Sequence, residues 1–298
     1  MPRTPNAIIT LLESHPEISL AYLTTQTDPR TIHIHTSTAH PRPSITLPHA
    51  LQAFQIEIHP QSTFNILRAP PLFARDTSPQ QACQNEPIQL GCQIQPEAAD
   101  WVGTAGAPVA FWIRPEEPAW GILSNWHVIA DGMERQGRRI FQPDDTHATI
   151  AHLLDWAGPD PSKPSELDAA IANADIDGFH SIDWKILGIG TPSPNSVAAA
   201  PGVAAIKTGR TTGTTEAICT AIGAAAKVGY GNFLATMTGL DVFTDAKTRF
   251  SAPGDSGSLI LAKACLCPMS LLFAGGGKIT LGIPARTIEN RFNLRFSP

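Results

Sequence analysis

The chain has 298 residues, of which 42% are hydrophobic and only 16% are charged, and its formal net charge is -5. This hydrophobic content supports a core and argues against wholesale disorder, whereas the negative charge leaves no basic field for the phosphates of DNA or RNA. The 23 glycines and 27 prolines favour turns and short strands over long helices. The composition therefore predicts a folded protein that does not bind nucleic acid.

The first 67 residues predict a small α+β unit. Apolar residues at helical spacing predict a helix over residues 5–14. Further short elements follow in chain order, namely a hairpin formed by 19–25 and 31–37, a turn of helix at 48–53 and a strand at 54–58. The next stretch, 68–87, is rich in proline and polar residues, which is typical of a linker or an irregular arm.

From residue 88 onward the sequence changes to repeated short strands separated by turn residues. The predicted strands are 109–113, 120–124, 140–142, 169–172, 203–207, 217–222, 241–243, 258–261, 271–274 and 280–283. A C-terminal helix is predicted at about 284–293, with a proline in its first turn. Many short strands at close spacing indicate an all-β sandwich or a pair of barrels.

The sequence predicts neither a membrane span nor a secretory signal. The longest uncharged stretch, 186–206, contains three prolines and many polar residues, and the first apolar run ends at Glu13. The five cysteines are an odd and sparse set for a disulfide scaffold. We therefore expect a cytoplasmic protein with reduced thiols.

Two groups of side chains have metal binding as an alternative interpretation. The spacing of four cysteines fits no usual zinc pattern; they are Cys83, Cys92, Cys265 and Cys267. A strand would place His33 and His35 on one face, and more histidines lie nearby, at His40, His49 and His59. Surface or hairpin histidines explain this second group better, so we expect no metal and no cofactor.

Three segments carry residues suited to nucleophilic catalysis. His127 lies at the exit of an apolar strand, and Asp168 directly precedes an apolar run. Ser256 lies in a tight turn between two glycines. A serine nucleophile needs a base to take its proton, and the base needs an acid to orient it. Together these residues predict a catalytic triad, although each alone would be an ordinary structural residue.

The glycines and the choice of acid follow from the same chemistry. A turn at Gly254 would aim its N–H and that of Ser256 at one point, forming an oxyanion hole in which a well-placed donor contributes ~3 kcal/mol. Gly257 would keep the space beside the nucleophile open for substrate. Asp168 is the preferred acid because the strand after it would bury it against the histidine. The alternative acids are Asp131, Asp175 and Asp177.

The order of histidine, aspartate and serine resembles that of the chymotrypsin-like serine peptidases. The segment 254–257 resembles the nucleophile loop of that family, and 168–172 resembles its aspartate strand. The segment 123–128 resembles the histidine strand in the form found in bacterial and HtrA-like members. Two further segments, 203–213 and 272–275, resemble parts of the second barrel in some bacterial and plant trypsin-like proteins. The resemblance covers about residues 88–293.

The resemblance implies a mostly β fold of two six-stranded antiparallel β-barrels with a small N-terminal α+β domain. The first barrel would span about 88–195 and the second about 196–283, with the site between them. The implied activity is that of a serine endopeptidase cleaving protein or peptide substrates through an acyl-enzyme. The implied substrate pocket contains no acid, so we expect it to accept a small or apolar side chain; its residues are Phe250, Ala274, Gly275 and Gly276.

Some positions depart from the family pattern. Trp126 and Ser258 stand where a small residue and a glycine are commoner. No activation sequence precedes the first barrel, so Asp255 is not expected to pair with a newly cut N-terminus. Residues 1–87 could therefore gate the cleft, recruit a regulatory partner or simply pack on the first barrel. Other functions on this fold are a catalytically silent peptide-binding module and an esterase with the same triad.

Overall fold

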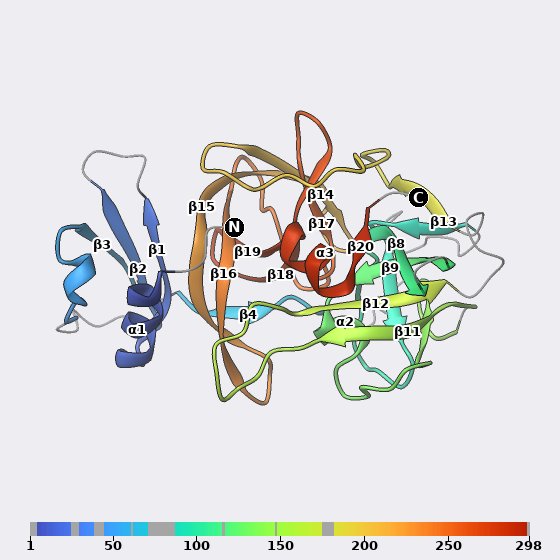
Figure 1. The fold of residues 1–298 in the computed structure, drawn as a ribbon, viewed down its shortest axis with the longest axis horizontal. Coiled ribbons are helices and arrows are strands. Elements are labelled where there is room, and N and C mark those ends of the chain that lie inside the picture. Colours follow the sequence, from blue (N-terminus) through green and yellow to red (C-terminus); the bar gives the residue numbers. More distant parts are fainter. Residues whose placement is uncertain are drawn as a thin grey trace.

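The computed structural model describes residues 5–24, 30–38, 45–60, 62–70, 87–114, 117–146, 148–174 and 182–296. The fold is mostly β, with a small helix-and-strand region at the N-terminus followed by two barrel-like sheets (Figure 1). Most of the predicted arm at 68–87 and the alternative acids Asp175 and Asp177 lie outside the described residues.

The first sheet carries the histidine and aspartate segments. Its strand order is β20-β8-β9-β12-β11-β10-β6-β7. The strands are β6 (Gln93–Pro96), β7 (Gly103–Thr104), β8 (Ala107–Arg114), β9 (Glu117–Ser124), β10 (Arg139–Phe141), β11 (Thr149–Ala157), β12 (Ala169–Ala174) and β20 (Leu294–Arg295). The sheet has eight strands rather than the expected six, partly because the C-terminal β20 returns to pair with β8.

The second sheet contains a closed barrel of six strands, as expected. They are β14 (Ala204–Gly209), β15 (Gly213–Gly229), β16 (Leu234–Asp245), β17 (Leu259–Ala262), β18 (Cys267–Gly276) and β19 (Ile279–Pro284). The order is β14-β17-β18-β19-β16-β15, and a further pairing of β14 with β15 closes the ring. Helix α3 (Ala285–Phe292) follows β19 and packs on it, where the C-terminal helix was predicted.

The N-terminal elements continue this second sheet. They are α1 (Asn6–Ser14), β1 (Ile18–Thr24), β2 (Thr31–Thr36), a 3-10 turn at His49–Leu51 and β3 (Gln55–His59), which confirms each element predicted there. β1 pairs with β15, and β2 and β3 follow outward (Figure 1). Apolar residues of α1, β1 and β2 form a separate core with Ala225 of β15. The N-terminal part is therefore joined to the barrel by hydrogen bonds and by packing.

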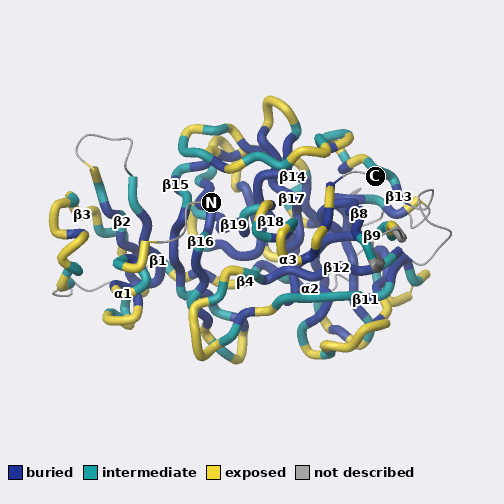
Figure 2. The backbone as a smooth tube through the Cα atoms, in the orientation of Figure 1, coloured by how far each residue is buried: buried dark blue, intermediate teal, exposed yellow. Residues whose placement is uncertain are grey.

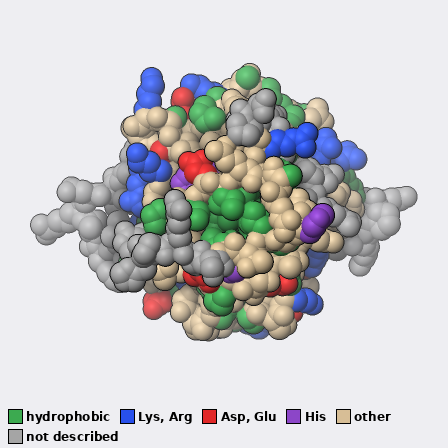
Figure 3. Space-filling view, turned by 90° about the vertical axis from the view of Figure 1, so that its left-hand side faces the viewer, with side chains coloured by type: hydrophobic (Ala, Val, Ile, Leu, Met, Phe, Trp, Pro, Cys, Tyr) green, Lys and Arg blue, Asp and Glu red, His purple; other side chains and the backbone are tan. Residues whose placement is uncertain are grey.

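Burial follows these layers. Figure 2 shows buried residues through both sheets and along β1 and β2, with exposed residues at the turns. Seen from the side of the N-terminal part, a group of hydrophobic side chains lies near the centre of the molecule (Figure 3). Ile56 on β3 is one of the few exposed large hydrophobic residues, at 42%.

Further elements were not predicted from the sequence. β5 (Ile88–Leu90) and β13 (Ile182–Ile186) form a small parallel pair. The short helix α2 (Trp126–Ile129) follows β9. β4 (Phe64–Ile66) pairs with β18 and β15, and it leads from the N-terminal part toward α2 (Figure 1).

The cysteines correct one prediction. Cys265 and Cys267 are joined by a disulfide at the turn between β17 and β18, whereas Cys219 is a buried free thiol. We expected a cytoplasmic location partly because we expected reduced thiols. Disulfides persist mainly in oxidising compartments, so the thiols no longer support that expectation. Among the described residues, no helix is long and apolar enough to cross a membrane.

Candidate active site

His127 and Asp168 form a buried pair on the first sheet. His127 lies on α2, directly after β9, and Asp168 directly precedes β12, the neighbour of β9. His127 Nδ1 is 2.6 Å from Asp168 Oδ2, and the backbone N–H of His127 donates to Asp168 Oδ1 at 3.1 Å. Asn125 donates to the backbone carbonyl of Asp168 at 2.7 Å. The carboxylate therefore fixes both the position and the tautomer of the imidazole.

Tyr230 is a third member of this group that sequence reasoning missed. It lies in the turn between β15 and β16, and its hydroxyl donates to Asp168 Oδ2 at 2.9 Å. Burial, together with the carboxylate of Asp168, raises the pKa of Tyr230 well above its usual value. The phenol therefore stays protonated and remains a donor to the carboxylate.

Ser256 lies in a turn that begins the β17 strand of the second barrel. The turn is held from the first sheet, because Thr104 Oγ1 donates to the carbonyl of Gly254 at 2.9 Å and the Thr104 N–H donates to that of Ser256 at 2.8 Å. Gly254 has φ +102°, where a side chain is rarely tolerated. The N–H groups of Gly254 and Ser256 converge on one acceptor, the carbonyl oxygen of Leu67, at 2.5 and 3.3 Å. This is the convergence of donors expected of an oxyanion hole.

The Ser256 hydroxyl is not hydrogen-bonded to the histidine. It donates to the carbonyl of Phe273 at 2.9 Å and accepts from the N–H of Leu67 at 3.0 Å. His127 Nε2 is buried and has no hydrogen-bond partner among the described residues. A proton transfer from Ser256 to His127 would first require the serine side chain to rotate away from Phe273.

Asp255 is neutralised by a lysine of the same barrel. Lys207 on β14 lies 3.3 Å from Asp255 Oδ2, and both side chains are fully buried. The remaining acceptor positions take hydrogen bonds from the N–H groups of Thr211, Thr212 and Ala252 and from the Thr212 hydroxyl. The segment 207–213 thus holds the turn that contains Asp255 and Ser256. Asp255 is therefore held by a lysine and by four hydrogen bonds within the second barrel.

Two of the four predicted pocket residues lie near the Leu67 side chain, and the other two lie beside the residues that precede it. Phe250 belongs to the same hydrophobic cluster as the Leu67 side chain, and a Cβ on Gly275 would lie 3.1 Å from Leu67 Cδ1. Ala274 instead pairs with residue 66 in the β4–β18 ladder, and Gly276 lies close to residue 63. Ser251 and Thr280, whose hydroxyls are 2.6 Å apart, add neutral polar groups near the same place.

Two sequence-based assignments change. Gly257 does not leave space for substrate, because a Cβ there would meet the Thr104 carbonyl oxygen at 2.2 Å and Ser124 Oγ at 2.4 Å. It is needed instead for the close contact between the two sheets. Asp131, an alternative acid, pairs with Arg68 at 2.7 Å rather than with His127.

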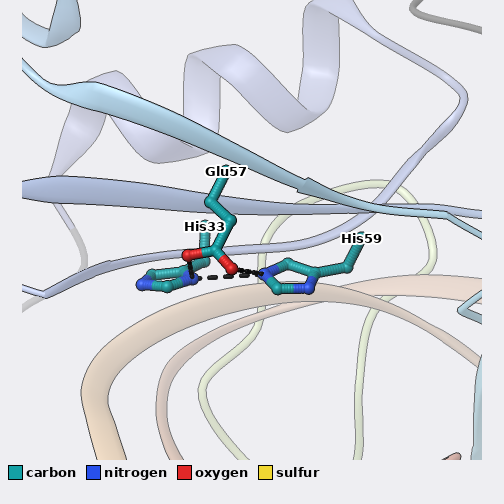
Figure 4. A group of neighbouring side chains, drawn as sticks. All are labelled: His33, Glu57 and His59. Atoms are coloured by element: carbon teal, nitrogen blue, oxygen red, sulfur yellow. Dashed lines mark hydrogen bonds and ion pairs between the residues drawn. The ribbon is translucent and has the colours of Figure 1, made fainter.

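The strands β2 and β3 bring three possible metal ligands together (Figure 4). His33 Nδ1 lies 3.2 Å from His59 Nε2 and 3.3 Å from Glu57 Oε2. Two ligands at a tetrahedral zinc ion with 2.0–2.1 Å bonds lie about 3.3 Å apart, so these atoms could hold such an ion. Hydrogen bonding and ion pairing account for the same distances without one. The cysteine alternative does not fit a metal, because Cys265 and Cys267 are joined to each other.

A cavity of about 750 Å³ lies next to the segment that precedes Asp168, because Glu166 and Leu167 are among its lining residues. It is lined partly by α3 and by Asp241 of β16. Ser270 donates to Asp241 Oδ2 at 2.6 Å, and burial raises the pKa of Asp241 to about 7. No local pattern marks this acid, because its burial depends on strands that are distant in the chain.

Comparison with solved structures identifies the architecture. Protease A of Thermobifida fusca is 18% identical, with a TM-score of 0.51, over 70% of this chain and 97% of that one. A chymotrypsin of Cellulomonas bogoriensis is 19% identical, with a TM-score of 0.50 and the same coverage. A Nocardiopsis protease is 16% identical, with a TM-score of 0.51, over 71% and 99%. These likenesses show the chymotrypsin-like fold. No protein-family model and no curated protein matches the sequence.

Proposed function

We propose that this protein is a serine endopeptidase of chymotrypsin-like mechanism. One observation carries the proposal: the peptide carbonyl of Leu67 is held by two N–H groups of the serine turn, and the next residue, Arg68, donates to the backbone carbonyl of His127, which forms a buried pair with Asp168. A protein that only bound peptides would have no physical need for both features. The solved structures with a similar fold include bacterial serine proteases, which supports the same interpretation.

The reaction follows from the positions of these groups. Ser256 rotates toward His127, which takes the hydroxyl proton as Oγ attacks the scissile carbonyl carbon. The N–H groups of Gly254 and Ser256 hold the developing oxyanion. His127 then gives the proton to the leaving amine, and water hydrolyses the acyl-enzyme by the same route. Asp168, held by Tyr230, stabilises the imidazolium throughout.

Substrates would bind as an added strand. The chain at 64–66 pairs antiparallel with β18, with residue 65 opposite Gly275 and residue 66 opposite Ala274. Strand addition of this kind recognises an extended peptide through its backbone. The side chain before the cut would enter the neutral pocket beside Phe250 and Gly275, which favours a leucine-sized apolar group. The N-terminal part would act as the gate, because its own chain occupies the cleft.

The test is hydrolysis of a quenched fluorescent peptide with the sequence of residues 64–69. We expect the full chain to cleave it, and Ser256→Ala and His127→Ala to lose at least about 100-fold in kcat/KM, since general-base catalysis supplies that much. Hydrolysis unchanged by Ser256→Ala would overturn the proposal. An ester cleaved while this peptide is not would favour the esterase.

A silent binding module is the second candidate, and one observation favours it. The Ser256 hydroxyl donates to Phe273 and not to His127. If this rotamer were permanent, the protein would bind extended peptides without cutting them. Peptide binding by the wild-type chain with no hydrolysis would then be the result.

A further inference from the structure

Residues 64–69 form strand β4 and the bridge at Ala69, and they are held on both sides of one peptide bond. Before that bond, the Leu67 N–H donates to the Phe273 carbonyl at 3.2 Å, next to the β4–β18 ladder. After it, Ala69 and Val102 exchange two backbone hydrogen bonds of 3.1 and 2.7 Å. The segment thus spans both sheets, one on each side of the Leu67–Arg68 bond.

The register of this segment selects a single carbonyl group. The oxygen of Leu67 accepts from the N–H groups of both Gly254 and Ser256. The Ser256 hydroxyl is hydrogen-bonded to the N–H of the same residue, so the nucleophile lies beside it. A peptide bound in order to be cut needs its reacting carbonyl at this place.

The side chains on the two sides of the bond fit different surroundings. Leu67 is 6% exposed and lies in a hydrophobic cluster with Phe250 and Leu272. The Arg68 guanidinium lies 4.2 Å from the centroid of the Trp101 ring, and its Nη1 donates to Asp131 Oδ2 at 2.7 Å. Nη1 also donates to the backbone carbonyl of His127 at 3.3 Å, which places Arg68 beside the general base.

We propose that the chain is its own first substrate and hydrolyses its Leu67–Arg68 bond within one molecule. The proposal rests on the endopeptidase function above. Ser256 Oγ bonds to the carbonyl carbon of Leu67, the C–N bond breaks, and His127 passes the hydroxyl proton to the amine of Arg68. Water then cleaves the Leu67–Ser256 ester, leaving a Leu67 carboxylate and restoring the serine hydroxyl.

The fragment ending at Leu67 stays attached after the cut. β1 remains paired with β15 through Leu20 and Ala21, and the α1 core includes Ala225 of β15. Cleavage therefore leaves a two-chain protein whose new carboxylate lies at the oxyanion hole. External substrates must displace the new C-terminus at Leu67 before they can bind at the oxyanion hole.

The test follows the purified full chain by intact mass and N-terminal sequencing. We expect the wild type to yield a new N-terminus at Arg68, at a rate independent of protein concentration, and Ser256→Ala to stay whole. Leu67→Asp places a charge in the neutral pocket and should slow the cut at least 100-fold. Ile56→Asp, an exposed position of the same N-terminal part, is the matched control and should be cut like the wild type.

A peptide with the sequence of residues 64–69 separates failure of this inference from failure of the function. If Leu67→Asp hydrolyses that peptide while the wild-type chain stays whole, the segment is an inhibitor and self-cleavage is refuted, but the endopeptidase function stands. If neither protein cuts the peptide or itself, both proposals are wrong. A rate proportional to protein concentration would refute the intramolecular reaction.

Discussion

Tyr230 and His127 are hydrogen-bonded to the same oxygen of Asp168. The Tyr230 hydroxyl donates to Asp168 Oδ2 at 2.9 Å, and His127 Nδ1 lies 2.6 Å from that oxygen. The tyrosine comes from the second barrel and the aspartate from the first. The contact therefore couples the relative position of the two sheets to the orientation of His127, the proposed base. It also supplies a fully buried carboxylate with a donor that burial keeps protonated.

Tyr230→Phe should lower kcat/KM about 10-fold or more while leaving KM nearly unchanged. The variant keeps the ring and removes one hydrogen bond to a charged acceptor, worth about 1.5–3 kcal/mol. Steady-state kinetics on the peptide with the sequence of residues 64–69 measures kcat and KM separately. An equal loss in Phe233→Leu, which removes the ring stacked on Tyr230, would show that packing rather than the hydrogen bond is responsible.

Lys207→Met should lower the free energy of unfolding by about 3–5 kcal/mol, because it leaves the buried Asp255 charge without its partner. Denaturant unfolding in a Ser256→Ala background measures this without self-cleavage. Lys263→Met is the matched control, since its ion pair with Glu216 is exposed, and it should change stability by less than about 1 kcal/mol. Equal effects in the two variants would contradict the assigned role of Lys207.

Gly275→Val should change specificity rather than abolish hydrolysis. Its Cβ would lie 3.1 Å from Leu67 Cδ1 and 3.2 Å from Ser251 Oγ, so it narrows the pocket. We expect kcat/KM for a leucine peptide to fall at least 10-fold relative to an alanine peptide, in line with ~1–3 kcal/mol per methylene-sized change. A proportional loss for both peptides would mean that the backbone, not the pocket, was damaged.

Asp241→Asn should stabilise the protein above neutral pH. The folded pKa of about 7 lies above the ordinary value of Asp, so the unfolded chain loses this proton first. Stability from this group is therefore greatest below pH ~4 and declines as pH rises to about 7. At pH 8 the neutral amide should add on the order of 2–4 kcal/mol, since one pKa unit is about 1.4 kcal/mol. Unfolding in the Ser256→Ala background, with the exposed Asp100→Asn as control, measures the difference.

The sequence predicted those parts of the site that depend on local patterns. A histidine after an apolar strand, an acid before one and a glycine-flanked serine can each be found in a short window. The oxyanion turn is local as well, because Gly254 and Ser256 are two residues apart. Most strands of the barrels were predicted for the same reason, since alternation and turn residues determine them.

The remaining features depend on contacts between distant segments. Tyr230 reaches Asp168 from another barrel, and Leu67 lies 189 residues before Ser256 in the chain. Nothing in the sequence of residues 64–69 marks them as a bound segment; their contacts with β18, Ser256 and Val102 do. The Cys265–Cys267 disulfide was missed because two closely spaced cysteines in a sparse set suggested free thiols.

Covalent labelling of Ser256 by a fluorophosphonate tests the central claim, that His127 and Asp168 make this serine a nucleophile. It should be read by peptide mapping in the wild type, Leu67→Asp, Ser256→Ala and His127→Ala. We predict an adduct on Ser256 in the wild type, a faster one in Leu67→Asp where the cleft is cleared, and at least about 100-fold slower labelling without His127. Labelling unaffected by His127→Ala, or none in either the wild type or Leu67→Asp, would contradict the claim.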